Sequence, residues 1–343
     1  MTGILYALLS AALFGVSAPL AKILLGSVSP WLLAGLLYLG SGLGLFAVRL
    51  LRRSGEAGLQ KKDLPWLAAA TVSGGMIGPV LLLFGLALSS AASASLLLNL
   101  ESVLTLVIAW VVFRENVDRR LLIGAVAIVA GAVVLSWPSD ASVSIGWGPL
   151  LIAGACLAWA IDNNLTRKVS AADPMQIAMV KGLAAGIVNV GIATLAGTAW
   201  PSGAVIGEAA LLGLFSYGVS LTLFVFALRH LGTARTGAYY ALAPFIGAGT
   251  AILLLHEPVT LGFVAGGVLM AIGLWLHLTE RHQHEHLHEP LEHEHMHTHD
   301  QHHRHDHASG TPPEPHSHPH RHPRMAHKHA HYPDIHHRHS HSH

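Results

Sequence analysis

The sequence predicts an all-α integral membrane protein, with ten transmembrane helices as two inverted five-helix repeats, followed by a disordered tail. Two features of its composition indicate this class. Of the 343 residues, 52% are hydrophobic and only 11% are charged, whereas about 25% of a soluble globular domain is charged. Histidine is the second feature, because all but three of the 27 histidines follow residue 281. The chain therefore joins an apolar part, residues 1–280, to a polar tail, residues 281–343.

The same composition argues against several classes of protein. A net charge of +1 gives no support for a nucleic-acid-binding protein, which needs a basic surface. The single cysteine, Cys156, excludes an internal disulfide and any metal site built from several cysteines. We find no glycine-rich phosphate loop and no hydrolytic or redox constellation of residues. We therefore expect neither an ATPase nor another enzyme.

A helix that crosses a membrane needs about 20 mostly apolar residues, and the apolar part supplies ten such runs. The first run has no basic residue before it and is followed by further apolar runs, so we expect a span rather than a cleaved signal. The ten predicted spans are residues 3–24, 31–51, 64–87, 92–113, 120–137, 147–166, 175–197, 206–228, 236–255 and 259–279.

Basic residues predict the orientation, because lysine and arginine are retained on the cytoplasmic side of a membrane. Those between the spans gather in the loops after spans two, four, six and eight, while the alternate loops have none unless Lys22, at the end of span one, is counted. Both termini are therefore expected in the cytoplasm of a plasma or inner membrane. The residues that set this bias are Arg49, Arg52, Arg53, Lys61, Lys62, Arg114, Arg119, Arg120, Arg167, Lys168, Arg229 and Arg235.

The two halves of the apolar part resemble each other weakly. Five spans in each half mean that the second copy enters the membrane from the opposite side, and inverted repeats of this kind are typical of secondary transporters. We expect domains at residues 1–138, 146–280 and 281–343. The matched segments are Phe14-Gly15-Val16-Ser17 with Trp159-Ala160-Ile161-Asp162, Lys22 with Arg167, Ser29-Pro30 with Asp173-Pro174, and Phe113-Arg114-Glu115 with Leu255-His256-Glu257.

A glutamate ends a span in each half, Glu115 and Glu257, and a helix with spaced glycines follows each one. With the stretch from Asn99-Leu100-Glu101 to Phe113-Arg114-Glu115-Asn116, this arrangement resembles the EamA-type transporters of the drug/metabolite transporter superfamily. The resemblance covers residues 1–280. It implies alternating-access transport of amino acids, other metabolites or drugs, often outward, and a subset of the family carries a similar histidine-rich cytoplasmic tail.

Charged side chains at membrane depth are costly and suggest function when they face a cavity. Glu101 can be a proton carrier, a ligand for a substrate amine or a structural carboxylate. Asp162 and Lys181 carry opposite charges, and with Glu101 they would suit a zwitterion such as an amino acid. Three consecutive polar residues in span six require a protein environment or a wet cavity. The predicted substrate pathway is Asn99, Glu101, Asp162, Asn163, Lys181, Tyr239 and Tyr240.

The tail repeats the pattern His-x-His, interleaved with Glu and Asp. Its low apolar content and prolines predict disorder, and neighbouring imidazoles in an extended chain can share a metal ion such as zinc, nickel, cobalt or copper. A purification tag and a pH buffer are the other interpretations. The expected metal ligands are His282, His284, His286, His288, His293, His295, His297, His299, His302, His303, His305 and His307.

Three functions are weighed. The first is a secondary transporter, an exporter of a small organic metabolite with a metal-binding tail. The second is a transition-metal permease whose tail delivers or senses the ion, although the spans offer few of the His, Cys or carboxylate ligands that a metal needs. The third is a metal store in the tail, with transport incidental. The expected partners are the lipid bilayer, a substrate, divalent metals at the tail and a second copy of the chain, with no required cofactor and no nucleic acid.

Overall fold

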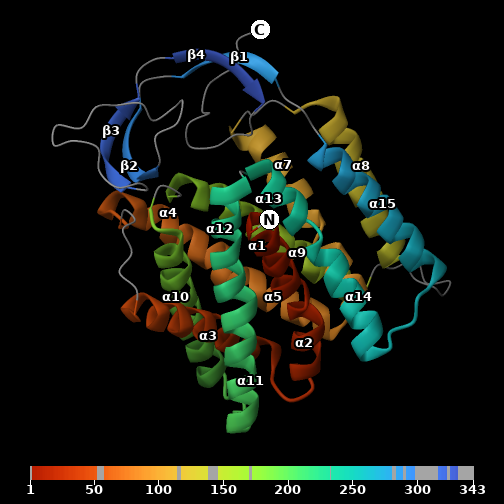
Figure 1. Ribbon diagram of the computed structural model, residues 1–343. Helices are drawn as coiled ribbons and strands as arrows, with labels where there is room; N and C mark the ends of the chain where they lie inside the picture. Colours follow the sequence, from red (N-terminus) through yellow and green to blue (C-terminus); the bar gives the residue numbers. More distant parts are fainter. Residues whose placement is uncertain are drawn as a thin grey trace.

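The computed structural model (Figure 1) is helical over the apolar part of the chain. The structure describes residues 2–51, 58–113, 117–137, 146–169, 172–231, 233–279, 283–288, 291–297, 316–322 and 325–330.

Each of the ten predicted apolar runs contains a helix or a set of broken helices. In the first half these are α1 (Thr2–Gly15), α2 (Ser17–Leu24), α3 (Pro30–Leu51), η1 (Lys61–Asp63), α4 (Leu64–Ala70), η2 (Thr71–Ile77), α5 (Gly78–Ala87), α6 (Ala91–Leu97), α7 (Leu100–Phe113) and α8 (Arg119–Ser136). In the second half they are α9 (Trp147–Thr166), η3 (Arg167–Val169), α10 (Pro174–Leu195), α11 (Gly203–Gly213), η4 (Leu214–Val219), α12 (Ser220–Leu231), α13 (Thr233–Tyr240), α14 (Ala243–Leu255) and α15 (Leu261–Leu278).

Eight helical segments of the described chain are long and apolar enough to cross a membrane. The remaining two predicted spans depart for visible reasons. The helix α9 includes the polar run from Asp162 to Asn164 in its last two turns, and the ninth span is divided into α13 and α14, of which α14 has only 13 residues. The helical membrane class is therefore confirmed, while ten crossings remain a prediction.

Prolines account for three of the breaks. A proline lacks the amide hydrogen that would pair with the carbonyl four residues earlier. Pro19 lies three residues after the α1–α2 break at Val16, and Pro244 follows the α13–α14 break. Pro79 follows η2, a π-helical turn in which the Gly78 amide bonds to the Ser73 carbonyl, five residues earlier. The broken helices thus leave carbonyl groups free for other partners.

Contacts between the two halves are arranged symmetrically. The helix α3 lies along α10, and α8 lies along α15 (Figure 1). Contact between α1 and α12 corresponds to contact between α5 and α9 when each span is exchanged for its counterpart in the other half. Each half also has a π-helical turn in its third span, η2 and η4. Two copies of one unit related by pseudo-twofold symmetry would produce this arrangement.

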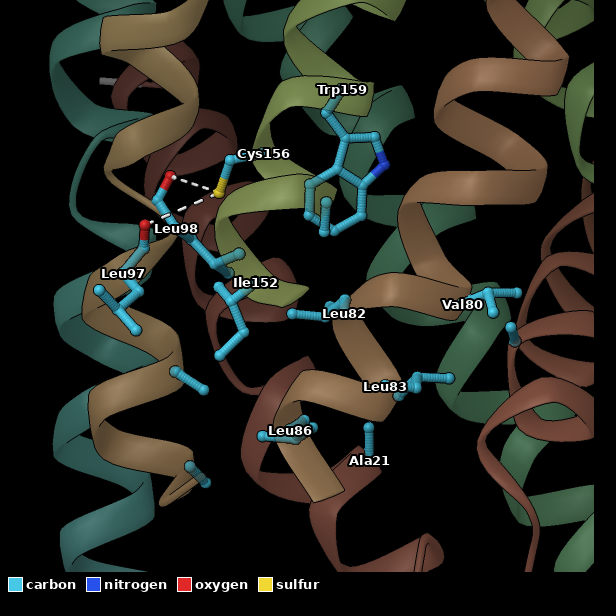
Figure 2. Close-up of a cluster of buried hydrophobic side chains, with 14 of the residues drawn as sticks. Ala21, Val80, Leu82, Leu83, Leu86, Leu97, Leu98, Ile152, Cys156 and Trp159 are labelled. Atoms are coloured by element: carbon cyan, nitrogen blue, oxygen red, sulfur yellow. Dashed lines mark hydrogen bonds between the residues drawn. The ribbon is translucent and has the colours of Figure 1, made fainter. Parts of the chain in front are cut away.

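Buried apolar side chains join the spans around α5, α6 and α9 (Figure 2). Leu82, Leu83 and Leu86 of α5 belong to one cluster with Ile152 of α9. In the same region the Cys156 thiol points to the carbonyls of Leu97 and Leu98, at 3.7 and 4.0 Å. These carbonyls lie at the break between α6 and α7, so the only cysteine has a structural role beside that break.

The tail differs from the disorder that its composition predicts. Four of its segments are strands: β1 (Gln283–His288) pairs antiparallel with β4 (Met325–Ala330), and β2 (Leu291–His297) pairs antiparallel with β3 (His316–His322). The His-x-His alternation has the period of two that a strand requires. Backbone pairing therefore orders these segments without the apolar core on which the prediction of disorder depended.

Small residues allow the backbones of α3 and α10 to approach closely. A Cβ atom added at Gly182 would lie 2.9 Å from the Cα atom of Gly42. By contrast, a Cβ atom added at Gly191, on the same helix, would meet no atom within 4 Å. Helix association in a membrane depends on such close packing.

We predict that Gly182→Val destabilises the protein by about 1–3 kcal/mol, because the added side chain forces two backbones apart. Gly191→Val is the matched control and should unfold at nearly the parent temperature. Thermal unfolding in detergent measures both variants. Equal unfolding temperatures would contradict the close packing of α3 on α10.

Candidate functional site

An ion pair joins the sixth and seventh spans. The Lys181 ammonium on α10 donates to both carboxylate oxygens of Asp162 on α9, at 2.5 and 2.6 Å. The Thr166 hydroxyl, one turn further along α9, donates to the same carboxylate at 2.8 Å. Asp162 is buried, and a buried charge is stable only when it is paired and hydrogen-bonded. Lys181 therefore compensates the charge of Asp162.

The π-helical turn η2 makes room for this ion pair. A Cβ atom added at Gly74 would lie 1.9 Å from Asp162 Oδ2, so the carboxylate occupies space that any other residue would fill. Because the Gly78 amide bonds to Ser73 in the π-helical pattern, the Gly74 carbonyl is free for side chains. It accepts hydrogen bonds from the Tyr38 hydroxyl at 3.0 Å and from Trp159 Nε1 at 2.9 Å. The turn thus ties α3 and α9 together beside the charges.

A second carboxylate lies between α7 and α9. Asn163 Nδ2 donates to Glu101 Oε1 at 2.7 Å. The Thr105 hydroxyl, four residues after Glu101 and on the same helix face, is buried without a hydrogen-bond partner in the described structure. The described partner of Glu101 is thus a neutral amide, whereas Asp162 has a full countercharge. When Glu101 is ionised, it carries a negative charge that neither Asp162 nor Lys181 compensates.

The three consecutive polar residues of span six have three separate environments. Asp162 pairs with Lys181, and the exposed Asn163 reaches Glu101. The buried Asn164 donates to the Ala160 carbonyl at 2.9 Å and to the Thr105 carbonyl at 3.4 Å. The sequence required either a protein environment or a wet cavity for these residues. The protein surrounds Asp162 and Asn164, whereas the Asn163 side chain is exposed.

Aromatic rings connect five segments beside this cluster. Tyr38 of α3 packs on Tyr217 of η4 with ring centroids 5.5 Å apart, and Tyr217 packs on Phe14 of α1 at 5.9 Å. Phe14 continues to Tyr240 of α13 at 5.7 Å, which packs on Phe224 of α12 at 4.8 Å. Tyr38 also donates to the Gly74 carbonyl, beside the Asp162 carboxylate. The ring series therefore begins next to the ion pair of Asp162 and Lys181.

Two predicted pathway residues lie elsewhere. Asn99 Nδ2 donates to the Leu96 carbonyl at 2.8 Å and contacts Met270 Sδ at 3.9 Å. Asn99 thus supplies a hydrogen-bond donor to a carbonyl at the break between α6 and α7. Tyr239 makes no hydrogen bond or ring contact with the cluster among the described residues, although Tyr240 joins the ring series. Sequence reasoning missed Tyr38 and Trp159, because an aromatic residue in an apolar span gives no sign of a buried carbonyl partner.

Of the predicted metal ligands, the structure places six in strands, three in β1 and three in β2. Within the described part of the chain, no group of three or more His, Cys, Asp or Glu residues is arranged to hold a metal ion. The predicted ligands outside the described residues are His282, His299, His302, His303, His305 and His307.

We predict that Lys181→Met costs about 3–5 kcal/mol of folding stability, because it leaves the buried Asp162 carboxylate without a countercharge. The double variant Asp162→Asn/Lys181→Met should recover most of this loss, since it removes both charges. Unfolding in detergent measures the folding stability of the parent and of both variants. A Lys181→Met protein as stable as the parent, or a double variant no better than Lys181→Met, would contradict the pairing.

Comparison with known proteins matches the apolar, helical part of the chain. Two stretches, residues 1–137 and 146–279, match the EamA-like transporter family. An uncharacterized transporter of Methanothermobacter thermautotrophicus is 30% identical over 282 residues, covering 77% of this chain and 82% of the relative. A probable amino-acid metabolite efflux pump of Salmonella typhimurium is 26% identical over 201 residues, covering 55% and 67%.

A solved crystal structure shares the fold. It aligns with a TM-score of 0.61 and 19% identity, covering 80% of this chain and 98% of the other. The two family matches together span the apolar part and leave out the histidine-rich tail. The chain therefore belongs to the EamA-like transporter family, a family of transporters rather than enzymes, and is a multi-pass membrane protein.

Proposed function

We propose that this protein is a secondary transporter that exports a small organic metabolite across the plasma or inner membrane. Transport proceeds by alternating access between two inverted halves of five spans each, with both termini in the cytoplasm. The packing of counterpart spans on each other, α3 on α10 and α8 on α15, supports this arrangement, as does the bias of basic residues between alternate loops. In transporters built from inverted repeats, the substrate binds near the midplane between the halves.

The uncompensated carboxylate of Glu101 carries the assignment of substrate. Because Lys181 is bound to Asp162, its ammonium is not free for a substrate carboxylate. Of the two charges of a zwitterion, only the ammonium then has a candidate partner in the cluster, Glu101. Among the described residues, Glu101 bonds to the neutral Asn163 amide alone, and the Thr105 hydroxyl on the same helix face has no partner there. The series of aromatic rings begins at Tyr38, beside the ion pair. A carboxylate and aromatic faces together suit an ammonium group. We therefore assign an amine-bearing metabolite, with amino acids as the first class to test.

A transition-metal permease is the alternative function. The support for this function comes from the histidine-rich tail and not from the spans. Within the spans, the side chains that bond to Glu101 and Asp162 are those of asparagine, threonine and lysine. Such groups suit an organic ion better than zinc or nickel, which prefer imidazole and thiolate ligands. Proteoliposomes that contain the purified full chain separate the two functions when amino acids, other amines and divalent metals are supplied in parallel.

We predict that Glu101→Gln lowers the flux of amine substrates at least about tenfold, because a charged partner is replaced by a neutral one. The matched control is Glu208→Gln, which removes the same charge from an exposed side chain on α11. Its flux should equal that of the parent. Unchanged flux in Glu101→Gln, with substrate present below saturation, would contradict the role of Glu101.

The tail is proposed to bind divalent metal ions. The backbone register pairs histidine with histidine in both sheets. Imidazole nitrogen is a ligand that zinc, nickel and copper accept. The facing pairs are His284 with His329, His286 with His327, His293 with His320, His295 with His318, and His297 with His316.

We predict that a chain ending at residue 280 loses nearly all of its zinc and nickel binding and keeps its substrate flux. Calorimetric titration of the full and shortened proteins measures binding, and proteoliposome assays measure flux. Equal metal binding by both proteins would contradict the tail assignment. Loss of organic flux on shortening would show that the tail takes part in transport itself.

A further inference from the structure

Lys22 holds the C-terminal end of α5. Its ammonium donates to the carbonyls of Leu86 at 2.6 Å, Ser89 at 2.9 Å and Ala87 at 3.2 Å. The last carbonyls of a helix lack partners within the helix and carry the negative end of its dipole. A lysine ammonium supplies the three donors and the positive charge that this end lacks. Lys22 is thus committed to the turn between α5 and α6, away from the Glu101 cluster.

Glu257 holds the other side of the same turn. One carboxylate oxygen accepts the Ala91 amide at 2.6 Å, and the other accepts the Ala92 amide at 2.7 Å. These are the first amides of α6, where the helix dipole is positive and charge-assisted hydrogen bonds are strong. The Glu257 carboxylate also attracts the Lys22 ammonium. We call Lys22, Glu257 and the turn of residues 88–90 the clasp.

The clasp connects the two halves of the protein. Lys22 ends the first span, Glu257 follows the ninth, and the turn that they hold links the third span to the fourth. By the predicted orientation, the loops at this end are extracytoplasmic. Just inside the clasp the backbones touch: a Cβ atom at Gly247 of α14 would lie 2.6 Å from the Gly15 carbonyl and 2.8 Å from Ser95 Oγ. No space separates α1, α6 and α14 at these contacts.

The backbone before Glu257 is held in an unfavourable conformation. His256 has φ of 53° and ψ of 36°, and it is the only described residue other than glycine with positive φ. A left-handed conformation costs energy in a residue with a side chain, and it persists where surrounding contacts enforce it. The two bonds from Glu257 to α6 are contacts of that kind. Breaking them would release the turn after α14.

We propose that the clasp is the extracytoplasmic gate of the transporter: it is closed in this structure and must break when the protein opens outward. The inference rests on the proposed alternating access, because movement between the halves has to separate Glu257 from α6. A cap that served only to stabilise α6 could come from within its own half, as Ser90 does by accepting the Ser93 amide. Glu257 instead reaches α6 from the other half.

A buried cysteine near the clasp would report opening. Ser95 is 1% exposed and contacts α14, so Ser95→Cys in a Cys156→Ala background gives one thiol just inside the gate. Its rate of reaction with a charged thiol reagent is measured for the full chain in lipid nanodiscs, without substrate. When closing is faster than labelling, this rate follows the population of the open state.

Adding Glu257→Gln should raise the labelling rate roughly tenfold, because an amide oxygen cannot replace a carboxylate that accepts two hydrogen bonds. Adding Glu208→Gln, which removes an exposed charge from α11, should leave the rate unchanged. An unchanged rate in Glu257→Gln would overturn the proposal.

General loosening of the fold is tested on the native thiol. Cys156, buried beside the α6–α7 break, is labelled in Glu257→Gln protein that has neither cysteine substitution. If the clasp is a gate, Cys156 in the Glu257→Gln protein should be labelled at the same rate as in the parent. A tenfold rise at Cys156, equal to the rise expected at Ser95→Cys, would overturn the proposal. Because no substrate is added, this result is independent of whether amines are the cargo.

Discussion

The hydrocarbon core of a membrane offers no water, so every carbonyl released by a broken helix must find a partner within the protein. The breaks in this chain show three ways of meeting that constraint. The Gly74 carbonyl, freed by the π-helical turn, receives Tyr38 and Trp159. The Leu96 carbonyl receives the Asn99 side chain at the α6–α7 break. At the end of α5, an ammonium takes three carbonyls at once. The first and third of these solutions join elements from different spans, so those irregular points also cross-link the bundle.

Charge follows the same logic. The ion pair between Asp162 and Lys181 sits where a glycine at position 74 leaves space, and it places two full charges among packed helices without an unpaired one. This leaves Glu101 as the group whose charge the described structure does not balance. A transporter can tolerate such a group where a substrate or proton completes it, because charged side chains within membranes are costly when they stay unpaired. The distinction between the two carboxylates depends on where Lys181 points, which the sequence does not determine.

Patterns of composition and spacing predicted the helical segments and several members of the site. Apolar runs located the helices, and polar residues at membrane depth identified Glu101, Asp162 and Asn163. The aromatic partners could not be predicted, because Tyr38 and Phe14 matter only through the packing of α3 and α1 on η4. The roles of Asn99 and Lys22 could not be predicted for a related reason. Each donates to backbone carbonyls that lack a partner at the end of a helix, and the sequence does not show where those carbonyls lie. The strands of the tail were not predicted, because the prediction of disorder considered only the low apolar content, whereas strand pairing depends on the alternation of residues.

The proposed gate requires α6 to move away from Glu257, whereas the cluster around Glu101 requires α7 to stay in contact with α9. Glu257 bonds across the halves to the first turn of α6, while Glu101 lies on α7, beyond the break at Leu98 and Asn99. Because the fourth span is divided there, its outer part can move with the gate while α7 keeps its contact with α9. The Cys156 thiol and the Asn99 amide already satisfy the carbonyls that such a hinge exposes. Under the proposed gate, the break in the fourth span would link the opening clasp to the proposed binding site around Glu101.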